Sequence, residues 1–326
     1  MRVALVSNAL EQPTRGNHTT IQRWMHFVEG IEILPVAADA AADLVERPDL
    51  VNGYHALNGG VPAHALARRH GLPLVINLGG TDLFACLKGD RAVAEVLEAA
   101  VAITGAFPAF GERLNECFGR EMPYSTVPRG VHIPADLPPR RPHEMLRVLL
   151  PAGMRPVKDP MLAIDMAERL IERGLPVELK LLGPELDSVY ARQITERVAG
   201  RDFVTLGEAG PGEMAAAYAA ADVVWNTSMH EGGSNALLEA VAAGCAVFAR
   251  DIPGNQELLA EAGAPGVLFG VQDLDGAERF HRELLRETEE ERAARVAAGH
   301  EWLRRYHDPA AEAVALVQVW RGALNS

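Results

Sequence analysis

The sequence predicts an α/β protein built from two Rossmann-like, doubly wound domains in tandem. Three observations support this fold: the chain has 326 residues, short apolar runs alternate with helical stretches in both halves, and the proline-rich segment 132–144 separates the two series. Strands that alternate with helices are typical of βαβ units on a parallel sheet. A chain of this length can bury two cores of ordinary domain size.

The first alternating series predicts an N-terminal domain over residues 1–138. Its apolar runs predict strands at 3–6, 31–36, 50–55, 74–78, 101–104 and 124–127. Helical stretches between them lie at 19–28, 61–69, 91–100 and 108–118.

The second series predicts a C-terminal domain over residues 145–305. Strands are expected at 146–150, 177–182, 203–206, 223–225, 246–249 and 267–269, and helices at 160–173, 188–198, 212–219 and 234–243. The charged, alanine-rich tail 278–305 is predicted to be helical, and 306–326 to form a last helix that packs back toward the first domain. Ligands of open α/β sheets bind beyond the carboxyl ends of the strands, so two such domains would face a cleft that holds the ligand.

Composition narrows the classes of partner. The net charge of -13 argues against nucleic acid and anionic membranes, which reward excess lysine and arginine. Three widely spaced cysteines do not suggest a secreted disulfide framework, and neither a signal peptide nor a membrane-spanning run is apparent. We therefore expect a cytoplasmic protein whose partners are small molecules, and leave open a homodimer.

The strongest chemical signal is the segment from Asn226 to Glu239, which follows a predicted strand. Two glycines permit close approach of a ligand, and the helix that starts after them offers free N–H groups and a dipole suited to phosphate. Glu231 and Glu239 would reach polar groups on either side of that phosphate; the alternative is a capped helix with a solvated glutamate. The candidate donor-binding residues here are Gly232, Gly233, Ser234, Asn235 and Glu239.

A second signal is the pair Arg155 and Lys158, at the turn after the first strand of the C-terminal domain. Two fixed cations there can hold a diphosphate and offset the charge that grows on it as a leaving group. The alternative is an ordinary solvated pair.

Weaker candidates follow strands of the N-terminal domain. Gly16 and Asn17 open a helix and either touch phosphate or form a plain turn, and the absence of GxGxxG excludes the dinucleotide fingerprint. Asp82 either accepts a hydrogen bond from a sugar or acceptor or caps a helix. His55 either contacts the acceptor or is a satisfied strand-end histidine. The candidates on the sugar or acceptor side are His55, Gly79, Gly80 and Asp82.

Taken in order, these segments resemble the family-four, or group 1, glycosyltransferases, most strongly from Leu146 to Phe269. Glu231 to Glu239 is similar to the family's E-x7-E signature, and Gly153 to Lys158 to its G-R-x-K loop. The resemblance implies a GT-B fold and retaining, metal-independent transfer from a UDP- or GDP-sugar, with no further cofactor. It also implies roles for Glu231 at the sugar, Glu239 at the ribose, and Arg155 and Lys158 at the diphosphate.

Two further segments extend the resemblance. Residues 203–208 resemble the stretch that borders the nucleobase, which makes Gly207 and Glu208 candidate base contacts. The segment Val127–Val131 is similar to the family's V-P-N-G-V strand end, with Arg129 at the asparagine position.

Gly79 marks a departure, because the family usually has a histidine of an H-G-x-D motif there. This departure and the short first domain resemble a branch that includes the glycosyltransferase 1 domain-containing proteins, the selenosugar synthase of selenoneine biosynthesis and the lincomycin thiol-glycosyltransferase. We therefore expect a small polar acceptor, one candidate being a sulfur or selenium nucleophile. A tight turn that requires glycine is the alternative explanation of Gly79.

Metal chemistry is not expected. Asp273 and Asp275 match the D-x-D of metal-dependent transferases but lie beyond the last predicted strand, and the eleven histidines show no ligand spacing. Two other functions remain as alternatives: a GT-B nucleotide-sugar 2-epimerase, and a nucleotide-sugar-binding regulatory protein that lacks turnover.

Overall fold

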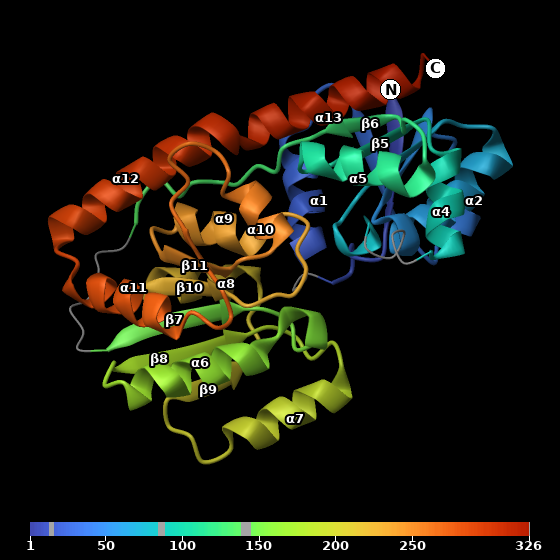
Figure 1. Cartoon of the computed structure of the whole chain (residues 1–326). Helices are drawn as coiled ribbons and strands as arrows, with labels where there is room; N and C mark the ends of the chain where they lie inside the picture. The colour runs from blue at the N-terminus through green and yellow to red at the C-terminus, as the bar shows by residue number, and fades with distance from the viewer. Residues whose placement is uncertain (13–15, 84–88, 138–144, 326) are drawn as a thin grey trace. The chain divides into compact units, whose positions relative to one another are not determined.

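The computed structural model describes residues 1–12, 16–83, 89–137 and 145–325, and divides into two compact units (Figure 1). One comprises Met1–Gly130 with His307–Ser326, and the other Val131–Tyr306. Each contains a parallel sheet with helices packed on it, which confirms the predicted fold class. The predicted linker 132–144 falls in part on 138–144, outside the described residues.

In the described part of the N-terminal unit, the sheet has six parallel strands in the order β2-β1-β3-β4-β5-β6. The strands are β1 (Arg2–Ser7), β2 (Glu32–Ala37), β3 (Leu50–Tyr54), β4 (Leu74–Asn77), β5 (Ala102–Gly105) and β6 (Tyr124–Thr126). The helices are α1 (Gly16–Phe27), α2 (Val61–His70), α4 (Arg91–Ala99), α5 (Pro108–Phe118) and α13 (Pro309–Ala323). Helix α1 begins three residues earlier than predicted from the apolar pattern.

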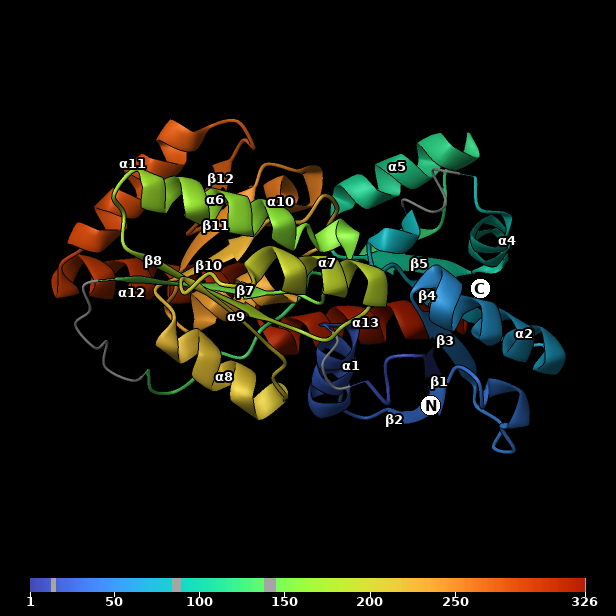
Figure 2. The same cartoon turned by 90° about the horizontal axis from the view of Figure 1, so that it is seen from below.

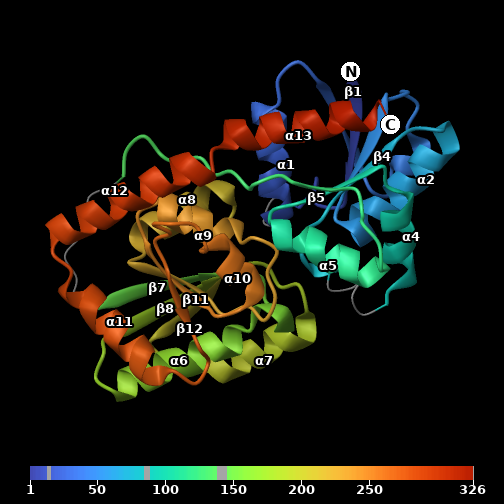
Figure 3. The same ribbon diagram turned by 45° about the horizontal axis from the view of Figure 1, so that its top comes forward.

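The C-terminal helix α13 belongs to this unit and packs across α1 (Figure 3). Its Trp320 is fully buried, and the indole nitrogen donates to Oδ1 of Asn52 on β3 at 2.7 Å. Asn52 donates in turn to Asn77, and Asn77 to Thr104, so a buried polar chain crosses three neighbouring strands. Such pairing is required where polar groups lie inside a core.

In the described part of the C-terminal unit, six parallel strands follow the order β12-β11-β10-β7-β8-β9. They are β7 (Leu146–Pro151), β8 (Val177–Leu182), β9 (Val204–Gly207), β10 (Val223–Asn226), β11 (Ala246–Arg250) and β12 (Val267–Phe269). Figure 2 shows α6 (Pro160–Glu172) and α11 (Leu274–Arg286) on one face of this sheet and α8 (Pro211–Ala220) and α9 (Asn235–Ala242) on the other. The remaining helices are α7 (Ser188–Val198), α10 (Pro253–Leu258) and α12 (Glu289–Tyr306).

The stretch 278–305, predicted to be helical, contains two helices, because α11 ends at Arg286 and α12 begins at Glu289. Between them the backbone N–H of Thr288 donates to the carboxylate of Glu291, and the N–H of Glu291 donates to the Thr288 hydroxyl. This reciprocal pair is a capping box, which starts a new helix. Charge and alanine content alone did not reveal it. No helix in the described residues is long and apolar enough to cross a membrane.

Candidate functional site

The site residues of the C-terminal unit gather where the strand order of its sheet reverses. Strands β8 and β9 follow β7 on one side, whereas β10 lies on the other side of β7. The loop after β7 carries Arg155 and Lys158, and the loop after β10 carries Glu231. Open α/β sheets bind ligands at such a switch point, beyond the carboxyl ends of the strands.

The short helix η3 (Pro156–Lys158) is tied to the loop after β10 by backbone groups. The N–H of Met229 donates to the carbonyl of Val157 at 2.9 Å, and the Thr227 hydroxyl donates to the carbonyl of Lys158 at 2.9 Å. The next residue, Asp159, forms an ion pair with Arg250 at 3.0 Å. These contacts fix the backbone from which the Lys158 side chain projects.

The Glu231 carboxylate is buried and bonded, with 8% of the residue exposed. Its Oε1 accepts from Nζ of Lys158 at 2.6 Å, from the Ser228 hydroxyl at 2.6 Å and from Nδ2 of Asn226 at 3.0 Å. Burial alone would raise the pKa of Glu231, but the Lys158 ammonium and the hydrogen bonds outweigh it and lower the pKa below 4.5. Glu231 is therefore an anion at neutral pH.

Helix α9 begins at Asn235, shortly after Glu231 in the chain. Gly233 adopts φ +94°, a left-handed conformation that glycine reaches without a steric cost. Gly232, Ser234 and Asn235 are buried beside it. The Ser234 hydroxyl accepts a hydrogen bond from Nδ2 of Asn226 at 3.3 Å and does not cap its own helix in the described structure. The positive end of the α9 dipole thus lies at the same strand ends as Arg155 and Lys158.

Close packing also fixes the Glu231 backbone from the side of α10. A Cβ atom added at Gly254 would lie 2.1 Å from the carbonyl oxygen of Glu231, so only glycine fits there. The approach of α10 restricts the conformations open to the loop.

Glu239 lies one turn inside α9 and is half-buried. Its Oε2 accepts from the hydroxyl of Tyr218 on α8 at 2.8 Å. Burial and the Glu239 charge raise the pKa of Tyr218 well above its usual value, so its hydroxyl stays protonated and donates. Tyr218 therefore orients the carboxylate expected at the ribose.

The other two C-terminal candidates lie at the end of a neighbouring strand. Gly207 is the last residue of β9, and its carbonyl accepts from the N–H of Gly183 at 3.0 Å. Glu208 follows and is exposed. Arg155 is half-buried at the start of η3, in an extended conformation. Gly207 and Glu208 lie at the carboxyl end of β9, and Arg155 follows the carboxyl end of β7.

The N-terminal candidates belong to the other unit. Gly16 and Asn17 are the first residues of α1, and Gly16 is exposed. The Asp82 carboxylate is fully buried, and it accepts from backbone N–H groups of Ala56, Gly79, Gly80 and Leu83 at 2.8–3.0 Å. Of the two alternatives for Asp82, this geometry favours the structural one.

His55 lies at the end of β3 with φ +69°, which is rare for a residue with a side chain. Its Nδ1 accepts from the N–H of Asn58 at 3.3 Å, which leaves the proton on Nε2, 3.0 Å from the Thr81 hydroxyl. A Cβ atom at position 79 would lie 3.2 Å from the His55 ring, so the ring packs directly over Gly79. The His55 ring thus occupies space beside Gly79 that a larger side chain would need.

The D-x-D carboxylates serve other purposes. Asp273 accepts from the N–H of Gly276 and caps α11, whereas Asp275 pairs with Arg173 at 2.5 Å on the surface. Their side chains therefore have separate partners.

Sequence reasoning missed several residues that hold the candidate site. Asn226 and Ser228 lie in the segment from Asn226 to Glu239. A polar residue directly after a buried strand indicates a candidate site residue, and this signal could have found Asn226. Tyr218 and Arg250 gave no signal, because their roles depend on contacts with residues distant in sequence.

The chain is similar to known proteins over most of its length. Residues 146–287 match the model of the family described as glycosyl transferases group 1. The chain is 26% identical over 283 residues to glycosyltransferase 1 domain-containing protein 1 of Xenopus tropicalis, covering 78% of this chain and 80% of that protein. Among solved structures, sucrose-phosphate synthase of Thermosynechococcus elongatus aligns with a TM-score of 0.81 at 15% identity, over 100% of this chain and 99% of that one.

The chain has the GT-B fold. A second GT-B structure, HepE of Anabaena in complex with UDP and glucose, aligns with a TM-score of 0.78 and 15% identity over 98% of this chain and 99% of HepE. HepE has also been solved with UDP-glucose. In this GT-B chain the group 1 match covers the C-terminal sheet and includes both Lys158 and Glu231.

Proposed function

We propose that this protein is a retaining, metal-independent glycosyltransferase that moves a sugar from a nucleotide diphosphate sugar to a small acceptor. The observation that carries the proposal is the 2.6 Å contact between Lys158 and Glu231 at the switch point of the C-terminal sheet. The group 1 family match and the UDP complexes of HepE support a nucleotide-sugar donor. UDP-sugars are therefore the first donors to test.

In this mechanism the diphosphate binds at the start of α9. Lys158, Arg155 and the helix dipole supply positive charge that stabilises the leaving diphosphate as the glycosidic bond breaks. Glu231 accepts hydrogen bonds from the sugar hydroxyls, and Glu239, oriented by Tyr218, binds the ribose. Gly207 and Glu208 border the base.

The protonation state of Glu231 bears on stereochemistry. A carboxylate with a lowered pKa is a weak base, so it is poorly suited to deprotonate an acceptor. A leaving phosphate oxygen on the same face of the sugar can accept that proton instead. Attack from that face retains the anomeric configuration.

The first experiment identifies the donor. A thermal-shift screen of UDP-, GDP- and other nucleotide sugars, followed by mass spectrometry of the reaction with small thiols, alcohols and selenophosphate, tests binding and transfer. NMR of the product's anomeric proton then reports retention or inversion. Conversion of the donor sugar without an acceptor would instead indicate the 2-epimerase, and binding without turnover would indicate the regulatory protein.

The acceptor is proposed to be a small polar molecule, with a sulfur or selenium nucleophile as the preferred case. A thiol is partly ionised near neutral pH and needs little help from a protein base. Matched thiol and hydroxyl acceptors of one carbon skeleton separate the possibilities by their initial rates. Transfer to the hydroxyl acceptor alone, or to a membrane lipid, would contradict this choice.

A further inference from the structure

The carboxyl end of β3 leads into a strained residue. His55 adopts φ +69° and ψ +113°, outside the regions that residues with a side chain ordinarily occupy. Its N–H donates to the carbonyl of Asn77 at 2.8 Å. Its carbonyl accepts from the N–H groups of Gly59 and Gly60 at 3.0 and 2.9 Å. A conformation of this kind costs free energy, persists only where such contacts impose it, and is concentrated at functional sites.

The turn after His55 is also unusual. The hydrogen bond from Gly60 back to the His55 carbonyl spans five residues and closes the π-helical turn η2 (Ala56–Gly60), which leads directly into α2. Turns of π-helix are rare and occur frequently at functional sites. The buried Asp82 carboxylate holds this turn by accepting from the N–H of Ala56 at 2.8 Å. Two uncommon backbone features therefore meet at one strand end.

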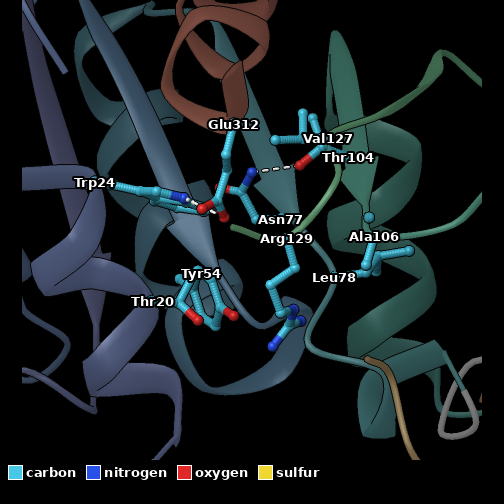
Figure 4. A pocket seen from close by; sticks show the side chains of 11 residues that line it. Thr20, Trp24, Tyr54, Asn77, Leu78, Thr104, Ala106, Val127, Arg129 and Glu312 are labelled. Atoms are coloured by element: carbon cyan, nitrogen blue, oxygen red, sulfur yellow. Dashed lines mark hydrogen bonds between the residues drawn. The ribbon is translucent and has the colours of Figure 1, made fainter. Parts of the chain in front are cut away.

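The end of the neighbouring strand is held rigidly too. Asn77, the last residue of β4, donates through its side-chain amide to the Thr104 hydroxyl on β5, among the residues that line the hollow drawn in Figure 4. In the turn that follows β4, the N–H groups of Gly79 and Gly80 donate to the Asp82 carboxylate. These two amides have partners within the protein. A ligand at this turn would therefore be bound by side chains rather than by these amides.

The strained backbone brings the His55 ring to Thr81. Because Nδ1 accepts from the N–H of Asn58, the proton lies on Nε2 and is donated to the Thr81 hydroxyl oxygen, 3.0 Å away. The histidine is buried, whereas Thr81 is exposed. A hydroxyl group is a donor as well as an acceptor, so Thr81 keeps a proton of its own to donate. Among the described residues, the structure shows no protein acceptor for that proton.

We infer that Thr81 donates a hydrogen bond to a hydroxyl oxygen of a carbohydrate substrate, and that His55 is the positioning residue that orients it. A neutral donor held in one direction suits an uncharged oxygen. The Asp82 carboxylate lies 4.0 Å from Nδ1 of His55, so an anionic group of a ligand would be repelled here. The inference rests on the proposed function, and the oxygen belongs either to the donor sugar or to the acceptor.

The first test removes the hydroxyl. Thr81→Val keeps the shape of the side chain, so the melting temperature should hold while the KM of one substrate rises about tenfold. Thr81→Ser should restore that KM. Separate KM values for donor and acceptor show which substrate carries the oxygen. The control, Thr205→Val, makes the same change at an exposed position of β9 and should alter neither KM. Wild-type kcat/KM for both substrates in Thr81→Val would overturn the inference.

The second test concerns the positioning role. His55→Phe keeps a ring that cannot donate, so it should raise the same KM as Thr81→Val, whereas the side-chain amide of His55→Gln can donate and should recover part of the loss. Because the two residues are proposed to act as a unit, His55→Phe combined with Thr81→Val should be no worse than Thr81→Val alone. Additive effects on KM, or a lower melting temperature with an unchanged KM in His55→Phe, would overturn the positioning role.

Deoxy analogues identify the oxygen and separate the two proposals. Donor sugars and acceptors that each lack one hydroxyl are compared in the wild type and Thr81→Val. We expect one analogue to have the same kcat/KM in both proteins, because its hydrogen bond to Thr81 is already lost. An equal loss in Thr81→Val for every analogue would overturn the inference alone. The absence of any transfer by the wild type would overturn the proposed function, and this role of Thr81 with it.

Discussion

Nζ of Lys158 lies 2.6 Å from Oε1 of Glu231, although the two residues are 73 positions apart. Lys158 is presented by a short helix after β7, and Glu231 by the loop after β10, which are adjacent strands of the C-terminal sheet. The Lys158 ammonium and two neutral hydrogen-bond donors keep the buried Glu231 carboxylate ionised, because they outweigh the cost of its burial. The pair therefore exists before a donor arrives.

Replacing Glu231 by glutamine should separate turnover from binding. Glu231→Gln keeps the shape and removes the charge, so we expect the rate to fall on the order of 100-fold or more while nucleoside diphosphate affinity changes little. Initial rates and calorimetry measure the two effects. Glu178→Gln makes the same change at an exposed position of β8 and should be silent. A variant with wild-type turnover would remove Glu231 from the site.

The hydrogen bond from Tyr218 to Glu239 predicts an indirect effect on donor binding. Tyr218→Phe leaves Glu239 in place but no longer orients it, so nucleotide affinity should fall by a few fold. Glu239→Ala removes the ribose contact and should weaken affinity more, by about 10-fold. Isothermal titration of both variants tests the order. Equal affinity in both variants and the wild type would contradict the ribose role.

Thr227→Val tests whether the backbone clamp positions Lys158. Valine has nearly the same shape but cannot donate to the Lys158 carbonyl, 2.9 Å away, so stability should fall by about 1 kcal/mol. If the clamp sets the lysine position, the KM for the donor should rise, and Thr227→Ser should restore it. A purely structural role would lower the melting temperature without changing that KM.

Removal of divalent cations should leave activity intact. Arg155, Lys158 and the α9 dipole are proposed to supply the positive charge that a metal ion supplies in D-x-D transferases. Rates before and after treatment with EDTA measure the effect, and Asp273→Asn with Asp275→Asn should not change them. Activity lost in EDTA and recovered with Mg²⁺ or Mn²⁺ would contradict a metal-independent mechanism.

The sequence predicted the two parallel sheets well, because strand and helix periodicities depend on local order. It also led to Lys158 and Glu231, because both occur in short segments of recognisable composition. It did not lead to the Tyr218–Glu239 hydrogen bond or to the ion pair of Arg23 and Glu312, which join α8 to α9 and α1 to α13. Such contacts are set by helix packing, which a single sequence does not encode in a local pattern.

A buried histidine predicts how the C-terminal unit responds to acid. His281 is fully buried, accepts from the Trp225 indole at 2.9 Å through Nε2, and donates from Nδ1 to the Ala277 carbonyl at 2.6 Å. Burial lowers its pKa from 6.5 to about 4, so the folded protein holds the neutral ring. Below pH 6.5 the unfolded chain binds a proton that the folded chain does not.

The contribution of neutral His281 to the free energy of unfolding should therefore be fully present above pH 6.5. It should be lost as the pH falls toward about 4. At 1.36 kcal/mol per pH unit the loss is about 3 kcal/mol. His281→Phe keeps an aromatic ring beside Phe248 and Phe280 but does not titrate, so its unfolding free energy should depend less on pH over this range. Denaturant unfolding at several pH values compares the slopes, with the exposed His26→Gln as control. Parallel pH profiles for His281→Phe and the wild type would mean that His281 is protonated in the folded protein.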